Sequence, residues 1–197
     1  MPISVTATNY RVESKAGVHI LRLDSHDGTN RLTRQCVLSL TEAIEVLAAR
    51  PLPLVIAGGD RYFSVGADLS EISALDGVSS LEFSRVGQKL TTAIQGFPAP
   101  VCAAISGYCM GGGLDLALAC HRRIASPHSV FGHRGAALGL ITGWGGTQRL
   151  PRLIGKGRAL EMFIAAEKVD ARRALRIGLV DTIAEDPVAE AIRIFCQ

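Results

Sequence analysis

The stretch PVCAAISGYCMGGGLDLALACHRRIA, residues 100–125, decides the fold of this chain. It predicts a strand, a glycine elbow, a helix and a second strand in close succession. The apolar run Val101–Ile105 is short, contains β-branched residues and lies between Pro100 and Gly107, which is typical of a strand buried on both faces. The leucines and alanines after the glycines predict a short buried helix. The stretch therefore indicates an α/β fold.

The glycine elbow, Gly111-Gly112-Gly113, predicts a place where a ligand meets the backbone. The first amides of a helix have no partner within the helix, and they attract negative charge. Asp115 follows within one turn, so an oxyanion site and an acid–base group would share one corner. Two plainer interpretations stay open: the glycines allow close packing of helix on strand, and Asp115 only interacts with the helix dipole.

A second strand-to-helix corner, FSVGADL, covers residues 63–69. Gly66 and the small residue Ala67 allow a ligand to approach the backbone closely, and Asp68 is suited to the position just before a helix. The sequence therefore predicts two corners of the same kind, each of which offers backbone amides to a ligand.

The rest of the chain alternates strands and helices. Residues 3–12 and 18–23 predict an N-terminal β-hairpin. Apolar periodicity, bounded by proline, glycine and capping residues, predicts helices over 33–50, 80–96, 147–154, 157–166, 170–178 and 187–197. Short strands are expected at 54–57, 123–125, 129–131 and 179–181. This alternation favours an α/β layer built from crossover units.

The composition is that of an ordinary globular protein. The chain has 197 residues, of which 48% are hydrophobic and 20% charged, so we expect a single domain, 1–197. A net charge of +3 is too small to indicate nucleic-acid binding. The five cysteines form no CxxC pair and fit reduced thiols. Without a signal-like or membrane-length apolar run, we expect a cytoplasmic protein that binds neither nucleic acid nor membrane.

Four segments resemble the crotonase superfamily, the enoyl-CoA hydratase/isomerase group. They are FSVGADL (63–69), PVCAAISGYCMGGGLDLALAC (100–120), GWGGTQRLPRLIGKGRALEM (143–162) and VDARRALRIGLVD (169–181). Because they span most of the chain, they outweigh a lone glycine-rich motif. The resemblance implies a crotonase-like spiral of ββα units and an acyl-CoA thioester as substrate, with no other cofactor and no metal. It also implies a homotrimer or a hexamer.

The resemblance assigns roles to both corners. It implies an oxyanion hole made by the backbone N–H groups of Val65 and Gly112, aimed at a thioester enolate. Asp68 is most simply a helix cap, but the resemblance also implies that the backbone around it contacts CoA. The implied CoA-binding residues are Gly66, Ala67, Asp68 and Gly111.

One acid–base position departs from the hydratase pattern. In hydratases of this family, one glutamate follows the glycine elbow and a second lies in a later loop; here these positions are Asp115 and Gly135. Hydration requires both an activated water and a proton delivered to the α-carbon, and two carboxylates divide that work. Asp115 would be the only carboxylate at the motif positions. His133 and Arg134, beside Gly135, are candidate accessory residues that hold a bicarbonate-like anion or move a proton.

Three functions therefore compete. The leading hypothesis is an acyl-CoA enzyme of the enoyl-CoA hydratase/isomerase type in fatty acid metabolism, with Asp115 as the catalytic carboxylate. The second is a crotonase-fold decarboxylase or a bicarbonate-assisted CoA enzyme. The third is a non-catalytic acyl-CoA-binding subunit, with a paralogous chain as partner. It is motivated by Gly135 and by the C-terminal helical tail of the family, most of which is not reached before Gln197. Either a neighbouring subunit or partner would then supply the lid over the substrate, or the pocket would be open.

Overall fold

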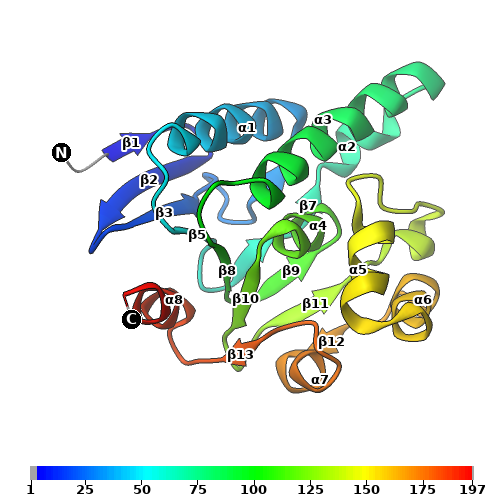
Figure 1. Ribbon diagram of the computed structural model, residues 1–197. Helices are drawn as coiled ribbons and strands as arrows, with labels where there is room; N and C mark the ends of the chain where they lie inside the picture. Colours follow the sequence, from blue (N-terminus) through cyan, green and yellow to red (C-terminus); the bar gives the residue numbers. More distant parts are fainter. Residues whose placement is uncertain (1–3, 197) are drawn as a thin grey trace.

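The computed structural model describes residues 4–196, whose strands form three β-sheets (Figure 1). The largest sheet has the order β1-β2-β3-β5-β8-β10-β13, and the second has the order β12-β11-β9-β6. A two-stranded sheet pairs β4 with β7. The strands are β1 (Ser4–Thr6), β2 (Tyr10–Lys15), β3 (Val18–Leu23), β4 (Arg31–Leu32), β5 (Leu54–Ala57), β6 (Tyr62–Ser64), β7 (Gly66–Ala67), β8 (Val101–Ile105), β9 (Tyr108–Met110), β10 (Arg122–Ala125), β11 (Val130–Gly132), β12 (Val169–Asp170) and β13 (Thr182–Ile183).

Helices connect these strands and cover the sheets. They are α1 (Arg34–Ala48), α2 (Leu69–Ser73), α3 (Gly77–Gln95), α4 (Gly112–Ala119), the 3₁₀ helix η1 (Gly135–Leu138), α5 (Gly146–Ile154), α6 (Lys156–Ala165), α7 (Ala171–Arg176) and α8 (Pro187–Phe195). No helix within residues 4–196 has both the length and the apolar character needed to cross a membrane.

The chain winds as a spiral. Strands β5, β8 and β10 lie side by side and parallel in the large sheet, and β6, β9 and β11, which directly follow them, do the same in the second sheet. Helical segments complete each turn, so every turn adds one strand to each sheet. This is the α/β spiral of ββα units that the sequence predicts.

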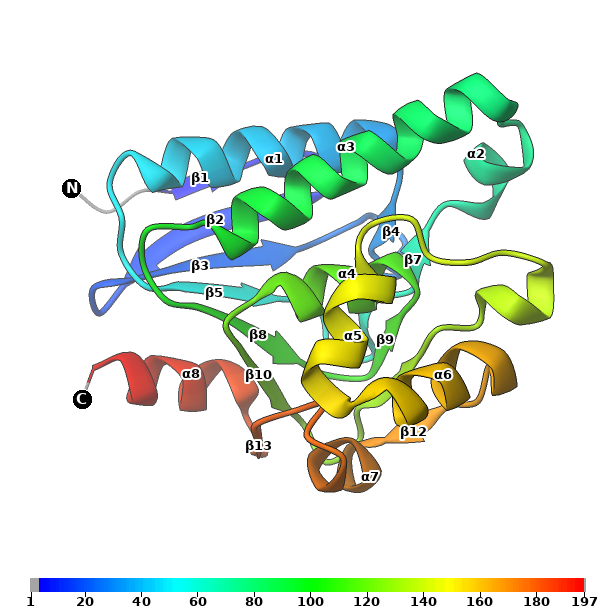
Figure 2. The same ribbon diagram turned by 45° about the vertical axis from the view of Figure 1, so that its right-hand side comes forward.

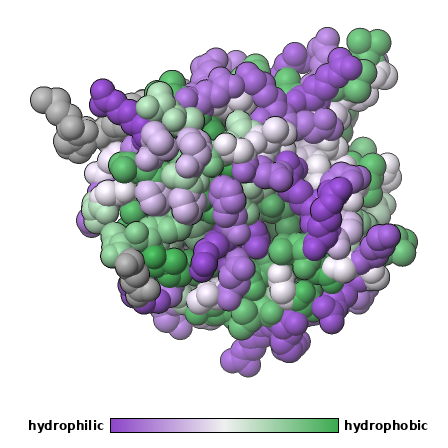
Figure 3. Space-filling view, in the orientation of Figure 1, coloured by the Kyte–Doolittle hydropathy of each residue, from purple (hydrophilic) through white to green (hydrophobic). Residues whose placement is uncertain are grey.

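The central strands β5 and β8 of the large sheet are buried on both faces. Helices α1 and α3 pack together over one face, and α8 lies against the other (Figures 1 and 2). Side chains alternate accordingly: Leu54 and Ile56 of β5 join the main core, whereas Val55 and Ala57 join the smaller core beneath α8. Hydrophilic residues predominate along the top of the view in Figure 3, where α1 and α3 face solvent.

Capping residues explain where several helices begin. The Thr33 hydroxyl accepts a hydrogen bond from the Cys36 amide at 3.1 Å and starts α1. Helix α3 begins at Gly77, earlier than expected, because Asp76 and Ser79 form a capping box. Asp170 caps α7, as predicted.

The strand prediction needs two corrections. Residues expected to lead directly into the glycine elbow contain an additional strand, β9, which is only three residues long and depends on pairing with β6 and β11. The strand expected at 179–181 lies at Thr182–Ile183, where it pairs with β10. The predicted hairpin and final helix include Ile3 and Gln197, which lie outside the described residues.

Four of the five cysteines pack in the interior as small apolar residues. Cys36, Cys102, Cys109 and Cys120 are buried, Cys196 is exposed, and all five are free thiols. Burial raises the pKa of the Cys36 thiol to about 11, so this group stays protonated at neutral pH.

Candidate active site

A cavity of about 440 Å³ lies where α2, α3 and α4 meet the loop after β11. It reaches both predicted corners, because Val65 and Ala67 of the first and Gly111, Gly112 and Asp115 of the second line it. The apolar part of its wall includes Leu69, Ile72, Leu75, Phe83, Ile141 and Phe163. A cavity with this lining suits a ligand that is largely hydrocarbon.

The two corners touch each other through their backbones. A Cβ atom added to Gly66, whose φ is +94°, would lie 3.0 Å from the Gly112 nitrogen. A Cβ added to Gly112 would lie 3.3 Å from the Ala67 nitrogen. Segments that are about 45 residues apart in the sequence therefore bring their amides to one place, and glycine is required at both positions for this close approach.

The structure gives the first of the two predicted oxyanion-hole donors an acceptor within the chain. The Val65 N–H donates to the Thr29 carbonyl at 3.1 Å, so it is already occupied. The Asp68 N–H points toward β4 and donates to the Leu32 carbonyl at 3.4 Å. The Ala67 nitrogen is the amide of this corner that lies beside Gly112, 3.3 Å from the position that a Gly112 Cβ would take. Ala67 thus replaces Val65 as the candidate donor.

The second predicted donor, Gly112, is still a candidate for the oxyanion hole. It is the first residue of α4, and the preceding Gly111 provides no side-chain cap. The first N–H groups of a helix have no intrahelical acceptor, which leaves the Gly112 N–H for a ligand. The neighbouring Gly111 N–H, in contrast, donates to the Gly132 carbonyl at 2.9 Å.

Asp115 lies one turn into α4 and is completely buried. Its Oδ2 atom accepts a hydrogen bond from the Thr142 hydroxyl. Its Oδ1 atom faces Nε2 of the buried His133 at 3.5 Å. Neither Oδ1 nor Nε2 has a hydrogen-bond partner within the described part of the chain. Buried polar atoms without partners are rare in folded proteins, and they are concentrated at functional sites.

Burial shifts the pKa values of the two residues in opposite directions. Loss of water raises the pKa of Asp115 from 3.8 to about 7, although the Thr142 hydroxyl favours the charged form. Loss of water lowers the pKa of His133 from 6.5 to about 4. At neutral pH, His133 is uncharged and Asp115 is close to the midpoint of its titration. An acid–base group works best when its pKa is close to the pH of the reaction.

These shifts predict how pH affects stability. Between pH 3.8 and about 7 the folded protein keeps a proton on Asp115 that the unfolded chain releases, so this group destabilises the fold as pH rises. Between pH 6.5 and about 4 the unfolded chain protonates residue His133 and the folded protein does not, so this group destabilises the fold as pH falls. The two effects oppose each other in the overlapping range. Asp115→Asn removes the effect of Asp115 and leaves that of His133. We therefore expect the free energy of unfolding of this variant to rise with increasing pH over this range, by up to about 1.4 kcal/mol per pH unit.

Urea unfolding of both proteins at several pH values from 4 to 6.5 measures this difference. Asp60→Asn, which makes the same change on an exposed side chain, is the matched control and should follow the unsubstituted protein. Equal pH slopes for Asp115→Asn and the unsubstituted protein would contradict the shifted pKa values.

Sequence reasoning missed two residues that enclose Asp115. Thr142 is the hydrogen-bond donor described above. A Cβ added to Gly146, the first residue of α5, would lie 2.1 Å from Asp115 Oδ1 and 3.1 Å from His133 Nε2. Gly146 therefore forms the back wall behind the pair. The motif GWGG contains it, but nothing in its spacing to Asp115 predicts this contact.

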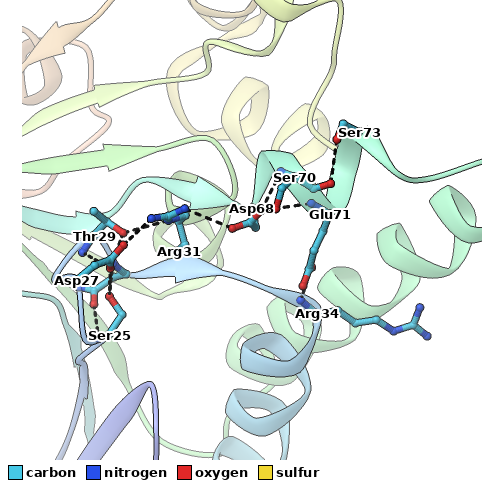
Figure 4. A network of polar contacts seen from close by, with 10 residues as sticks. Ser25, Asp27, Thr29, Arg31, Arg34, Asp68, Ser70, Glu71 and Ser73 are labelled. Atoms are coloured by element: carbon cyan, nitrogen blue, oxygen red, sulfur yellow. Dashed lines mark hydrogen bonds and ion pairs between the residues drawn. The ribbon is translucent and has the colours of Figure 1, made fainter.

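Asp68 serves as a helix cap (Figure 4). Its carboxylate accepts hydrogen bonds from the Ser70 and Glu71 amides at 2.8 and 3.2 Å, at the start of α2. Arg31 lies between Asp68, at 3.6 Å, and Asp27, which connects α2 to the loop before β4. The Ser70 hydroxyl, which also donates to this carboxylate, lowers the pKa of Asp68 most, and the two amides and Arg31 lower it further. Its side chain thus has a structural role at the edge of the cavity wall.

The loop position that carries a carboxylate in hydratases is closed to one here. Gly135 begins η1 and lines the cavity, but a Cβ there would lie 2.7 Å from the Leu140 carbonyl oxygen. Arg134 is exposed. Within residues 4–196, Asp115 is the only carboxylate that lines this cavity.

The family model and the named relatives show an enzyme that processes acyl-CoA thioesters, and the spiral fold and the cavity agree with them. The chain belongs to the enoyl-CoA hydratase/isomerase family, whose model matches residues 13–197. It is 34% identical over 180 residues to a crotonyl-CoA hydratase from Syntrophomonas wolfei, an alignment that covers 90% of this chain and 69% of that relative. It is 46% identical over 135 residues to a probable enoyl-CoA hydratase from Bacillus subtilis, which covers 68% of this chain and 52% of the relative.

Solved structures agree with this assignment. DspI from Pseudomonas aeruginosa superposes with a TM-score of 0.90 at 35% identity, over 95% of this chain and 73% of that one. An enoyl-CoA hydratase from Bacillus anthracis superposes with a TM-score of 0.89 at 31% identity, over 94% and 74% of the two chains. The spiral fold and membership in the crotonase superfamily are confirmed.

Proposed function

We propose that this protein moves protons at the α-carbon of an enoyl-CoA thioester, and thereby hydrates its double bond or shifts it. The observation that carries the proposal is the buried Asp115 carboxyl, which lines the same cavity as Ala67 and Gly112. A carboxyl in that position, with its pKa raised to about 7, is able to give and take a proton at neutral pH. The named relatives act as hydratases, which supports the same class of substrate.

The N–H groups of Ala67 and Gly112 would hold the thioester oxygen. Proton transfer at the α-carbon moves negative charge onto that oxygen, and donors placed beforehand stabilise the charge at little cost of reorganisation. One such donor contributes about 3 kcal/mol to transition-state stabilisation. The contact between the two corners supports this role, because it brings both nitrogens to one end of the cavity.

The apolar wall would bind the acyl chain. Leu69, Ile72 and Leu75 on one side and Ile141 on the other present hydrocarbon to the cavity. The CoA part would run along the backbone at Gly66, Ala67, Asp68 and Gly111, an assignment that rests on the family resemblance. Family membership likewise leads us to propose a homotrimer or hexamer, a place in cytoplasmic fatty acid metabolism, and no cofactor besides the CoA of the substrate.

The anion-assisted alternative has weaker support. It needs a positive site beside Gly135 to hold bicarbonate or a carboxylate. Burial lowers the pKa of His133 to about 4, so this residue carries no charge at neutral pH. Of the predicted accessory residues His133, Arg134 and Gly135, only the exposed Arg134 is then positively charged. We therefore give priority to the enoyl-CoA reaction.

Loss of the ultraviolet absorbance of a conjugated 2-enoyl-CoA thioester tests hydration, and its appearance from a 3-enoyl-CoA tests the shift of the double bond. We expect turnover in at least one assay, with a pH–rate profile that changes near pH 7 as Asp115 titrates. Bicarbonate and a malonyl-type thioester are added separately as probes of the alternative. Turnover that requires bicarbonate, or decarboxylation without enoyl-CoA turnover, would reject the proposal in favour of that alternative.

A further inference from the structure

We infer that His133 is a second proton-carrying residue of the site, and that it and Asp115 share one proton between Nε2 and Oδ1. This inference rests on the proposed function and adds the group that hydration needs in place of the carboxylate missing at Gly135. The sequence offers no hint of the pairing, because the two residues belong to different turns of the spiral.

The contact itself supports a shared proton. Nε2 and Oδ1 are both enclosed, face each other at 3.5 Å, and have no other partner among residues 4–196. Two buried polar atoms left without hydrogen bonds are costly, whereas one proton between them satisfies both. At most one ordinary hydrogen bond is possible here, so the proton count of the pair determines whether it is satisfied.

The surroundings hold the pair in place. Asp115 Oδ2 is fixed by the Thr142 hydroxyl, and the His133 ring packs against Phe163 with ring centroids 5.1 Å apart. Gly146 lies directly behind both atoms and leaves no room for even a methyl group. Both line the cavity, so a substrate there would meet two proton-carrying groups at one point.

The pair closes a complete hydration cycle. Water adds to the β-carbon of the enoyl thioester, and as the C–O bond forms its O–H bond breaks and the proton passes to His133 Nε2, which the Asp115 proton leaves in the same step. The electron pair of the double bond becomes an enolate, held at the thioester oxygen. Protonated Asp115 gives its proton to the α-carbon, where the enolate electron pair forms the new C–H bond. The imidazolium then returns one proton to the Asp115 carboxylate, which restores both residues.

Substitution of His133 by glutamine tests this assignment. Glutamine keeps a polar partner for Asp115 but carries no titratable proton. We expect hydration to fall about 10²- to 10⁴-fold. Proton exchange at the α-carbon, which requires Asp115 alone, should change less than about tenfold when deuterium uptake from D₂O is followed by mass spectrometry. His128→Gln, the same change on an exposed histidine, should leave both rates unchanged.

The two rates separate a chemical role from a structural one. If His133→Gln lowers hydration and exchange by the same factor, His133 only supports the fold of the site. If it lowers neither, His133 carries no proton in the reaction. Either result overturns the inference while the proposed function stands, because Asp115 would still be required.

Nitrogen NMR of the histidine rings gives a readout that needs no turnover. In the unsubstituted protein, we expect the His133 ring signals to change in step with the titration of Asp115, since the two residues share a proton. Asp115→Asn should abolish that change, and Thr142→Val, which removes the other hydrogen bond to the same carboxyl, should retain it. Identical His133 titrations with and without Asp115 would refute the pairing. A coupled titration in a protein that turns over no enoyl-CoA would instead refute only the proposed function.

Discussion

Replacement of Asp115 by asparagine is expected to lower kcat for enoyl-CoA turnover about 10²- to 10⁴-fold, with little change in KM. Asparagine nearly preserves the shape of the carboxyl and still accepts the Thr142 hydrogen bond, but it has no proton to exchange. The effect is large because Asp115 is the sole carboxylate lining the cavity among residues 4–196. Initial rates with a 2-enoyl-CoA over a range of concentrations separate kcat from KM.

Two further measurements make this result specific. Asp60→Asn on the exposed surface should leave kcat unchanged. Binding of a saturated acyl-CoA, measured by calorimetry, should also be nearly the same for Asp115→Asn as for the unsubstituted protein, since the cavity keeps its shape. If Asp115→Asn turns over substrate at the unsubstituted rate, Asp115 has no part in the reaction and the proposed function fails.

Gly112→Ala should lower kcat about 10²- to 10³-fold, the typical loss for one oxyanion-hole donor. The added methyl group would lie 2.5 Å from the ring of Trp144 and 3.3 Å from the Ala67 nitrogen. Because neither backbone nor indole has room, the two amides must move apart, and they would no longer reach one oxygen atom. Steady-state kinetics on an enoyl-CoA, with the melting temperature as a measure of folding, tests this expectation.

A second glycine-to-alanine variant distinguishes local crowding from a general effect. Gly157 lies near the start of α6, and a Cβ there would meet nothing within 4 Å. Gly157→Ala should keep full activity and stabilise the helix by up to about 1 kcal/mol. If Gly112→Ala retains full activity while folded, the thioester oxygen is not bound at this corner, and the oxyanion hole must be sought elsewhere.

Much of the fold could be predicted because its signals are local. The apolar run of β8, the proline and glycine boundaries and the caps at Thr33, Asp68 and Asp170 each lie within a few residues of the element that they define. Strand β9 was missed since its three residues form a strand only by pairing with β6 and β11. Its existence depends on partners that the sequence does not mark.

The residues of the site likewise fall into those that a local pattern predicts and those that only the folded chain brings together. Asp115 and Gly112 follow from their spacing within one helix start, and both line the cavity. The Val65 N–H donates to the Thr29 carbonyl, which is 36 residues away, and no local pattern reveals this contact. The contacts of His133, Thr142 and Gly146 with Asp115 join separate turns of the spiral. Only the folded chain brings them together.

Trp144 packs against α3 and α4 at two positions where glycine leaves room for its indole ring. Its indole occupies the space that a Cβ would take at Gly87 of α3, where the separation would be 2.2 Å, and at Gly112 of α4. A larger residue at either glycine therefore requires a smaller one at position 144. We therefore expect positions 87, 112 and 144 to covary among related sequences, which an alignment of the family would show.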